Sequence, residues 1–219
     1  MIKTVIFDMD GVLIDSMNVW LEEGYKLLKD LSNINALESV HKDVPIRART
    51  IINDLIEAGY SEEFCYNLHQ TWRKNMKQRY LTDIKLKPRV IELLKLLKDK
   101  KINIALASAT KKELINAVIK HHGIEKYFDY VISVGEVGKD KFHPDIYLSC
   151  ASYFNTKPEE CLVFEDAYHA LMTVKKANFK TIGVYDEHSK SLFDKIKEVA
   201  DYTIHSYDEI LDNLFFIEY

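Results

Sequence analysis

The feature that most constrains the fold is the stretch of residues 3–16, KTVIFDMDGVLIDS. It opens with an apolar run, Thr4 to Phe7, without polar alternation, which is typical of a strand buried on both faces of a parallel sheet. Asp8 and Asp10 follow at once. We therefore expect both aspartates at the carboxyl end of this strand, where open α/β sheets hold their ligands.

Asp8 and Asp10 are spaced so that they share one crevice. Two residues of extended chain span about 6.6 Å and return the side chain to the same face. Gly11 allows a sharp turn beside them. Two carboxylates about 4 Å apart repel by about 4 kcal/mol at an effective dielectric constant of about 20, and Mg²⁺ would offset this repulsion. The alternative is that one aspartate caps the next helix and the other is solvated.

Composition indicates an ordered globular protein. The chain has 219 residues, 47% hydrophobic and 29% charged, which suits one sizeable domain with an insertion or two modest ones. A net charge of −4 without a basic stripe argues against nucleic acid as a partner. No apolar stretch reaches about 18 residues, so we expect no membrane partner and a cytoplasmic location. Separately, we expect a monomer or a weak homodimer. The three cysteines lack C-x-x-C spacing, which argues against a disulfide framework or a zinc site.

Hydrophobic periodicity divides the chain into two parts. Residues 16–82 show only helical spacing, which predicts an inserted helical cap domain. Residues 1–15 and 83–219 alternate strands with helices, which predicts an α/β core with a doubly wound parallel sheet. In the core we expect helices at 89–100, 112–122, 144–154, 167–177, 189–199 and 208–216, and strands at 102–107, 130–134, 161–164, 181–185 and 202–205.

Polar residues follow other predicted strands at the same edge. Ser108-Ala109-Thr110 offers hydroxyls and backbone N–H groups to a phosphoryl oxygen, although a helix cap is the alternative. Glu165 and Asp166 form a second acidic pair at a second strand end. Lys141 precedes another predicted helix, and its charge would offset that of the acids and a phosphoryl group.

In this order, D-x-D-G-V-L-x-D-S, A-S-A-T, K-x-x-P-D-I-Y and F-E-D-A resemble the motifs of the haloacid dehalogenase superfamily. The resemblance covers nearly the whole chain and is weakest in residues 30–82. It is closest to the branch with a small helical cap after the first strand, which includes β-phosphoglucomutase and many sugar-phosphate phosphatases. It implies that Asp8 is a nucleophile that forms an aspartyl-phosphate and that Asp10 is the general acid and base.

The same resemblance implies the binding residues. Mg²⁺ would be held by Asp8, the backbone carbonyl of Asp10 and Asp166, with Glu165 in or beside its ligand shell. The phosphoryl group would be held by Ser108 and Lys141, with Ala109 and Thr110 contributing backbone contacts. In the cap, Arg47 is predicted to contact a distal phosphate, with Arg49 as its rival, and Trp20 to shape the substrate pocket; an apolar helix face in the cap core is the alternative for Trp20.

The resemblance leaves the reaction open between three hypotheses. The first is an Mg²⁺-dependent phosphatase acting on a small phosphorylated metabolite, such as a sugar phosphate. The second is a hexose-phosphate mutase, against which stands Trp20, because β-phosphoglucomutase has a histidine there. The third is a non-catalytic, phosphate-binding regulatory protein. The family's usual proline after the motif lysine is Phe142 here, and Arg89, Ala170 and Asn178 replace glycines that are common in the pattern.

Overall fold

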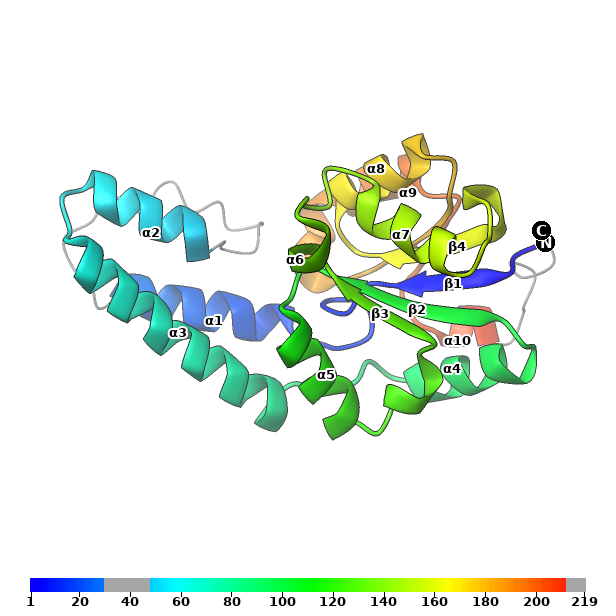
Figure 1. Cartoon of the computed structure of the whole chain (residues 1–219), viewed down its shortest axis with the longest axis horizontal. Coiled ribbons are helices and arrows are strands. Elements are labelled where there is room, and N and C mark those ends of the chain that lie inside the picture. The colour runs from blue at the N-terminus through cyan, green and yellow to red at the C-terminus, as the bar shows by residue number, and fades with distance from the viewer. Residues whose placement is uncertain (30–47, 212–219) are drawn as a thin grey trace. The chain divides into compact units, whose positions relative to one another are not determined.

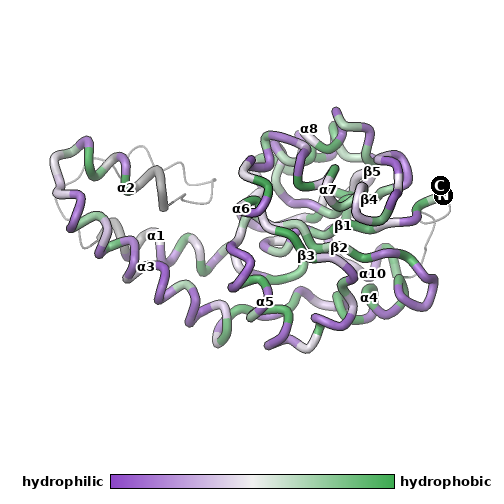
Figure 2. Tube along the Cα trace, viewed as in Figure 1, coloured by the Kyte–Doolittle hydropathy of each residue, from purple (hydrophilic) through white to green (hydrophobic). Residues whose placement is uncertain are grey.

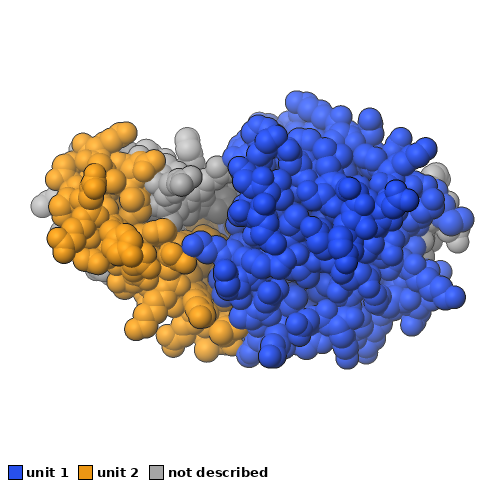
Figure 3. Space-filling model, in the orientation of Figure 1, with its two compact units in different colours: residues 1–15, 85–219 blue, residues 16–84 orange. Residues whose placement is uncertain are grey.

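The computed structural model describes residues 1–29 and 48–211, so the predicted cap residue Arg47 lies outside the described part. The chain divides into two compact units (Figure 3). Unit 1 comprises Met1–Asp15 with Lys85–Tyr219, and unit 2 comprises Ser16–Ile84. The sequence analysis placed these boundaries after residues 15 and 82.

Unit 1 is built on one parallel sheet of six strands in the order β3-β2-β1-β4-β5-β6 (Figure 1). The predicted α/β class with a doubly wound parallel sheet is confirmed. Its strands are β1 (Thr4–Phe7), β2 (Asn103–Ser108), β3 (Tyr130–Ser133), β4 (Cys161–Glu165), β5 (Lys180–Val184) and β6 (Tyr202–Ile204). Every strand pair is parallel, so all carboxyl ends meet at one edge.

Helices cover both faces of this sheet. On one face lie α7 (Asp145–Tyr153), α8 (Tyr168–Lys176) and α9 (Phe193–Val199), and on the other α4 (Val90–Asp99), α5 (Lys112–His121) and α10 (Asp208–Leu211). The short helix α6 (Val134–Val137) follows β3. The strands are the apolar centre of unit 1, and polar residues concentrate on its helices (Figure 2).

The starts of two helices differ from the sequence expectation for a reason that the backbone shows, and the end of a third lies outside the described residues. The helix expected at 189–199 begins as a 3₁₀ helix, Glu187–Leu192, and becomes α-helical only at Phe193. The helix expected from residue 89 begins at Val90, because Arg89 has a left-handed backbone with φ of 67°. The helix expected at 208–216 is described only as far as Leu211.

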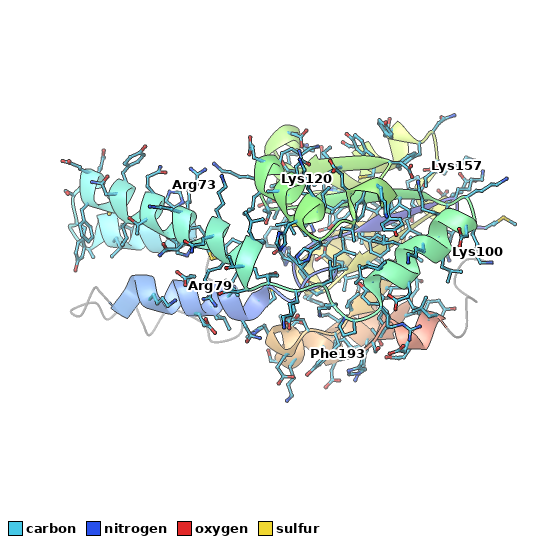
Figure 4. The ribbon with its side chains drawn as sticks, turned by 90° about the horizontal axis from the view of Figure 1, so that it is seen from below. Arg73, Arg79, Lys100, Lys120, Lys157 and Phe193 are labelled. Atoms are coloured by element: carbon cyan, nitrogen blue, oxygen red, sulfur yellow. The ribbon has the colours of Figure 1, made fainter. Side chains whose placement is uncertain are left out.

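Unit 2 contains three helices within the described residues: α1 (Met17–Lys29), α2 (Ala48–Glu57) and α3 (Glu62–Thr82). Ion pairs join α1 to α3, since Arg79 lies 2.7 Å from Glu22 and 3.1 Å from the buried Glu23 (Figure 4). No helix in the described ranges of either unit has the length and apolar character needed to cross a membrane.

Candidate active site

Sheet register brings acids from two distant segments together. Phe7 of β1 pairs with Phe164 of β4, so Asp8 and Glu165, the next residues, lie side by side at the carboxyl edge. Oxygen atoms of Asp8, Glu165 and Asp166 all lie within 4.8 Å of one another, and all three side chains are buried. The two predicted acidic pairs thus contribute three members to one cluster.

The carboxylate of Asp10 lies outside this cluster of three. Its Oδ2 accepts a hydrogen bond of 2.8 Å from the Thr110 hydroxyl, which follows β2. The backbone N–H of Thr110 donates to Oγ of the buried Ser108 at 3.0 Å. The A-S-A-T segment therefore reaches Asp10 through the Thr110 side chain, whereas the sequence analysis assigned this segment to the phosphoryl group and predicted no bond from Thr110 to Asp10. The helix-cap alternative for Ser108 does not hold, because Lys111 is the N-cap of α5.

Lys141 is the cation of the cluster. It lies in the turn between α6 and α7, is 6% exposed, and extends its ammonium group between two acids. Its Nζ is 2.6 Å from Oδ1 of Asp8 and 2.7 Å from Oε2 of Glu165. Lys141 therefore forms an ion pair with each of the two carboxylates, and its contact with Glu165 is also a hydrogen bond. This lysine therefore joins the segment after β1 to the end of β4.

Burial and charge control ionisation in this cluster. Burial, aided by the charge of Glu165, raises the pKa of Asp8 to about 8, although Lys141 opposes this change. Burial and then the charges of Glu165 and Asp8 raise the pKa of Asp166 well above its usual range. Burial is the largest single influence on Glu165 and acts to raise its pKa. The charge of Lys141 and the hydrogen bonds from Lys141, Tyr147 and the Ala167 backbone together outweigh burial, so the pKa is lowered. The pKa of Lys141 is raised well above its usual value, because Asp8 and Glu165 outweigh its burial.

The cluster fits a hard divalent cation. Three buried carboxylates face a single ammonium group, so full ionisation leaves uncompensated negative charge. Oδ1 of Asp8 is buried and lies 2.6 Å from Nζ of Lys141. Oxygen ligands with such charge are those that Mg²⁺ prefers. Asp8, Asp166 and Glu165 are therefore suited to surround one Mg²⁺ ion.

Gly11 has a role that the sequence analysis assigned only in general terms. Its φ is 74°, in the left-handed region that favours glycine. A β-carbon on this residue would lie 2.3 Å from Oδ2 of Asp166. The turn after Asp10 therefore passes so close to the second acidic pair that a side chain at residue 11 would collide with Asp166.

The structure adds three contacts that the motifs did not predict. The buried Tyr207, after β6, donates its hydroxyl to the backbone carbonyl of Val12 at 2.9 Å. Lys87 donates to the buried Asp186 at 3.0 Å, beyond the end of β5. Tyr147, inside the K-x-x-P-D-I-Y motif, donates to Glu165. Only Tyr147 carried a sequence signal, because it belongs to a recognised motif.

The predicted cap residue Trp20 packs inside unit 2. Its indole N–H donates to the Tyr80 hydroxyl at 2.7 Å, and its ring lies 5.3 Å from that of Trp72. Tyr80 is fully buried. These contacts agree with the alternative that Trp20 belongs to an apolar helix face, and its predicted contact with substrate stays a prediction.

The chain is similar in sequence to a family of known proteins. A profile of the haloacid dehalogenase-like hydrolases matches residues 5–184. A phosphorylated carbohydrates phosphatase from Thermotoga maritima is 29% identical over 181 residues, 82% of this chain and 83% of the relative. Hexitol phosphatase B from Escherichia coli is 26% identical over 199 residues, 84% of this chain and 83% of the relative.

Solved structures extend the similarity to the fold. The crystal structure of β-phosphoglucomutase from Clostridium difficile has a TM-score of 0.74 and 27% identity, and the match covers 96% of this chain and 93% of that one. A putative β-phosphoglucomutase from Thermotoga maritima has a TM-score of 0.76 and 26% identity, covering 97% and 98%. The extent of the family match shows that this chain belongs to the haloacid dehalogenase-like hydrolases, as its sequence motifs predict.

Proposed function

We propose that this protein is an Mg²⁺-dependent phosphatase that hydrolyses a small phosphorylated metabolite through an aspartyl-phosphate on Asp8. The observation that supports the proposal most directly is the buried cluster in which Lys141 and two further acids surround Asp8. Uncatalysed hydrolysis of phosphate monoesters is so slow that enzymes accelerate it by up to about 10²¹-fold. A nucleophile, a cation site and a fixed lysine in one place supply the combination that such a rate requires.

In the first half of the reaction, a carboxylate oxygen of Asp8 attacks phosphorus and the bond from phosphorus to the leaving oxygen breaks. Asp10 donates a proton to that leaving oxygen, so an alcohol departs. In the second half, Asp10 accepts a proton from water, which attacks the phosphorus of the aspartyl-phosphate. The bond between Asp8 and phosphorus breaks, which regenerates the carboxylate and releases orthophosphate.

The other residues of the site bind and orient. Lys141 would neutralise the transferring phosphoryl group, together with Ser108 and the backbone of Ala109. Thr110 orients Asp10 through its hydrogen bond. Asp8, the backbone carbonyl of Asp10 and Asp166 would hold Mg²⁺, with Glu165 in or beside the ligand shell. Bound Mg²⁺ would withdraw charge from a phosphoryl oxygen and offset the charge of the acids.

A sugar or polyol phosphate is the proposed substrate class. Two relatives that match more than four-fifths of this chain carry the names phosphorylated carbohydrates phosphatase and hexitol phosphatase B. We further propose that unit 2 is the cap that selects the leaving group, with Arg47 contacting a distal phosphate and Trp20 shaping the pocket. Caps of this kind exclude water while the reaction proceeds.

Phosphoryl transfer within a hexose phosphate is the second candidate, because two similar solved structures carry the name β-phosphoglucomutase. Trp20 argues against it. An indole is a hydrogen-bond donor only, and the Trp20 donor is already bonded to Tyr80, so this residue lacks the acid–base capacity of histidine. We therefore favour hydrolysis over phosphoryl transfer within a hexose phosphate.

The deciding experiment measures orthophosphate release from a panel of phosphorylated sugars, polyols and nucleotides, with Mg²⁺ and with a chelator. We expect Mg²⁺-dependent release that Asp8→Asn abolishes and that Asp99→Asn, on an exposed residue of α4, leaves unchanged. Unchanged turnover in Asp8→Asn would rule out the aspartyl-phosphate and favour a non-catalytic role for this site. Glucose 6-phosphate formed from β-glucose 1-phosphate only with a bisphosphate primer would identify a mutase instead.

A further inference from the structure

Tyr147 contacts the acidic cluster through Glu165, although no motif role is assigned to it. It stands on α7, six residues after Lys141, and is fully buried. Its hydroxyl donates to Oε2 of Glu165 at 2.9 Å, and Nζ of Lys141 lies 5.6 Å from the centre of its ring. The rest of the ring packs in the core cluster, beside Phe179 and Ile146.

Hydrogen bonds from three donors use most of the acceptor sites of the Glu165 carboxylate. Oε2 accepts from both Lys141 and Tyr147, and Oε1 accepts from the backbone N–H of Ala167 at 3.2 Å. An ionised carboxylate offers about four lone-pair sites, two on each oxygen. These three donors therefore leave one site, and it is on Oε1.

The distribution of donors between the two oxygens of Glu165 affects the position of Lys141. Lys141 is nearly equidistant from Asp8 and Glu165, at 2.6 Å and 2.7 Å. With the Lys141 ammonium and the Tyr147 hydroxyl both bonded to it, Oε2 has no lone pair left for a third contact. Without that hydroxyl, one of the three anchors of Glu165 is lost and its carboxylate gains freedom to rotate. Lys141 and any cation beside Glu165 would then meet a less ordered partner.

We propose that Tyr147 is a positioning residue of this site: its hydroxyl fixes the Glu165 carboxylate so that Oε2 stays with Lys141 and only Oε1 remains available to the cation or its water ligands. The role rests on the proposed function in so far as the cation is Mg²⁺. It acts through Glu165 and requires no contact between Tyr147 and substrate.

The test uses Tyr147→Phe, which keeps the buried ring and removes only the hydroxyl. Tyr127→Phe is the matched control, because Tyr127 is also buried but lies after α5, away from the cluster. Mg²⁺ affinity is measured by titration calorimetry, and kcat and KM are measured on the best ester of the panel. We expect the Mg²⁺ dissociation constant to rise about 10- to 100-fold in Tyr147→Phe, with kcat falling more than KM changes, and wild-type values in the control.

A double-mutant cycle separates positioning from general support of the fold. If Tyr147 acts through Glu165, adding Tyr147→Phe to Glu165→Gln should weaken Mg²⁺ binding no further than Glu165→Gln alone. Additive losses in the double variant, or wild-type Mg²⁺ affinity in Tyr147→Phe, would overturn the inference. A wild-type protein that binds Mg²⁺ but releases no phosphate would refute the proposed function, and the same titrations would still decide the role of Tyr147.

Discussion

Gly11 and Asp166 are in such close contact that no β-carbon fits between them. The nearest atom to a β-carbon built on Gly11 is Oδ2 of Asp166, at 2.3 Å, followed by the carboxyl carbon at 2.7 Å. Both atoms belong to the acidic cluster, in which Asp166 lies beside Asp8. A main-chain turn therefore limits where Asp166 can lie.

Gly11→Ala should accordingly remove Mg²⁺ binding and activity, because the new methyl group displaces the Asp166 carboxylate. The control is Gly138→Ala, which has a similar φ of 76° but no atom within 4 Å of the new β-carbon. Both variants should lose about 1–2 kcal/mol of stability from the left-handed backbone alone. Only Gly11→Ala should lose Mg²⁺ affinity in calorimetry; equal affinities in the two variants would contradict the steric argument.

Lys141→Met should be strongly destabilising and inactive, because it removes the cation that two buried carboxylates share. Removal of one partner from a buried ion pair costs about 3–5 kcal/mol, and part of that cost should return when Mg²⁺ is added. Lys139→Met is the control, since Lys139 pairs with Asp145 at the exposed surface of the same loop. Urea unfolding with and without Mg²⁺ measures both effects, and a Lys141→Met protein as stable as the control would refute them.

The metal-free protein should lose stability as pH rises. The pKa of Asp8 is raised from 3.8 to about 8 in the folded state, and that of Asp166 is raised as well. A raised folded pKa favours folding fully below the unfolded pKa, and this advantage is lost as pH rises through the folded pKa. The loss should therefore extend from about pH 4 to about pH 8.

Mg²⁺ should reverse this trend, because it binds the ionised carboxylates and so binds more tightly as pH rises. The increase in unfolding midpoint that Mg²⁺ produces should be larger near pH 8 than near pH 5. Asp8→Asn should flatten the pH dependence of the metal-free protein. An Mg²⁺ effect of the same size at both pH values would show that these carboxylates are not its ligands.

The strands and the acidic pairs were predictable because their signals are local. Buried parallel strands are apolar on both faces, so the apolar runs Thr4 to Phe7 and Cys161 to Phe164 predict strands by themselves. Parallel strands share one carboxyl edge, which places Asp8 and Glu165 together before any coordinates are known. The alternation of helices and strands along the chain likewise predicted the α/β class with a doubly wound parallel sheet.

The supporting contacts were not predictable because they depend on register between distant segments. Tyr207 reaches Val12 across 195 positions of sequence, and Lys87 reaches Asp186 across 99. A tyrosine before a terminal helix and a lysine before a proline have no pattern that distinguishes them from surface residues. The hydrogen bond from the Thr110 side chain to Asp10 was not predictable either, because the two residues are 100 positions apart in the sequence.

The C-termini of α4 and α5 share one backbone geometry that provides a further prediction. Lys101 and Gly123 both have positive φ, at 57° and 67°, and each N–H bonds to a carbonyl three residues earlier. The next residues, Ile102 and Ile124, bond to carbonyls five residues earlier, which completes a Schellman motif. Only glycine adopts this conformation without steric cost.

Lys101→Gly should therefore stabilise the protein by about 0.5–1 kcal/mol, and Gly123→Ala should destabilise it by about 1 kcal/mol. Urea unfolding of the two variants checks the pair, with phosphatase activity expected to stay at the wild-type level. A Lys101→Gly protein less stable than wild type would show that the lysine side chain contributes more than its strained backbone costs.

Thr110→Val should lower kcat while leaving most of the stability in place. The valine keeps the shape of threonine but cannot donate to Oδ2 of Asp10, so the proposed proton donor loses the bond that orients it. Misplacement of a catalytic group by about 1 Å can cost about 100-fold in rate, and we expect kcat to fall by about 10- to 100-fold with little change in KM. Thr181→Val is the control, because Thr181, within β5, also donates its hydroxyl to a carboxylate, that of Asp201; its hydroxyl in addition accepts from the Asp201 N–H, so this change should cost the more stability of the two. The control also removes a buried hydroxyl that donates to a carboxylate, so the difference in kcat between the two variants reports the orientation of Asp10. Equal kcat values in the two variants would show that Asp10 needs no help from Thr110.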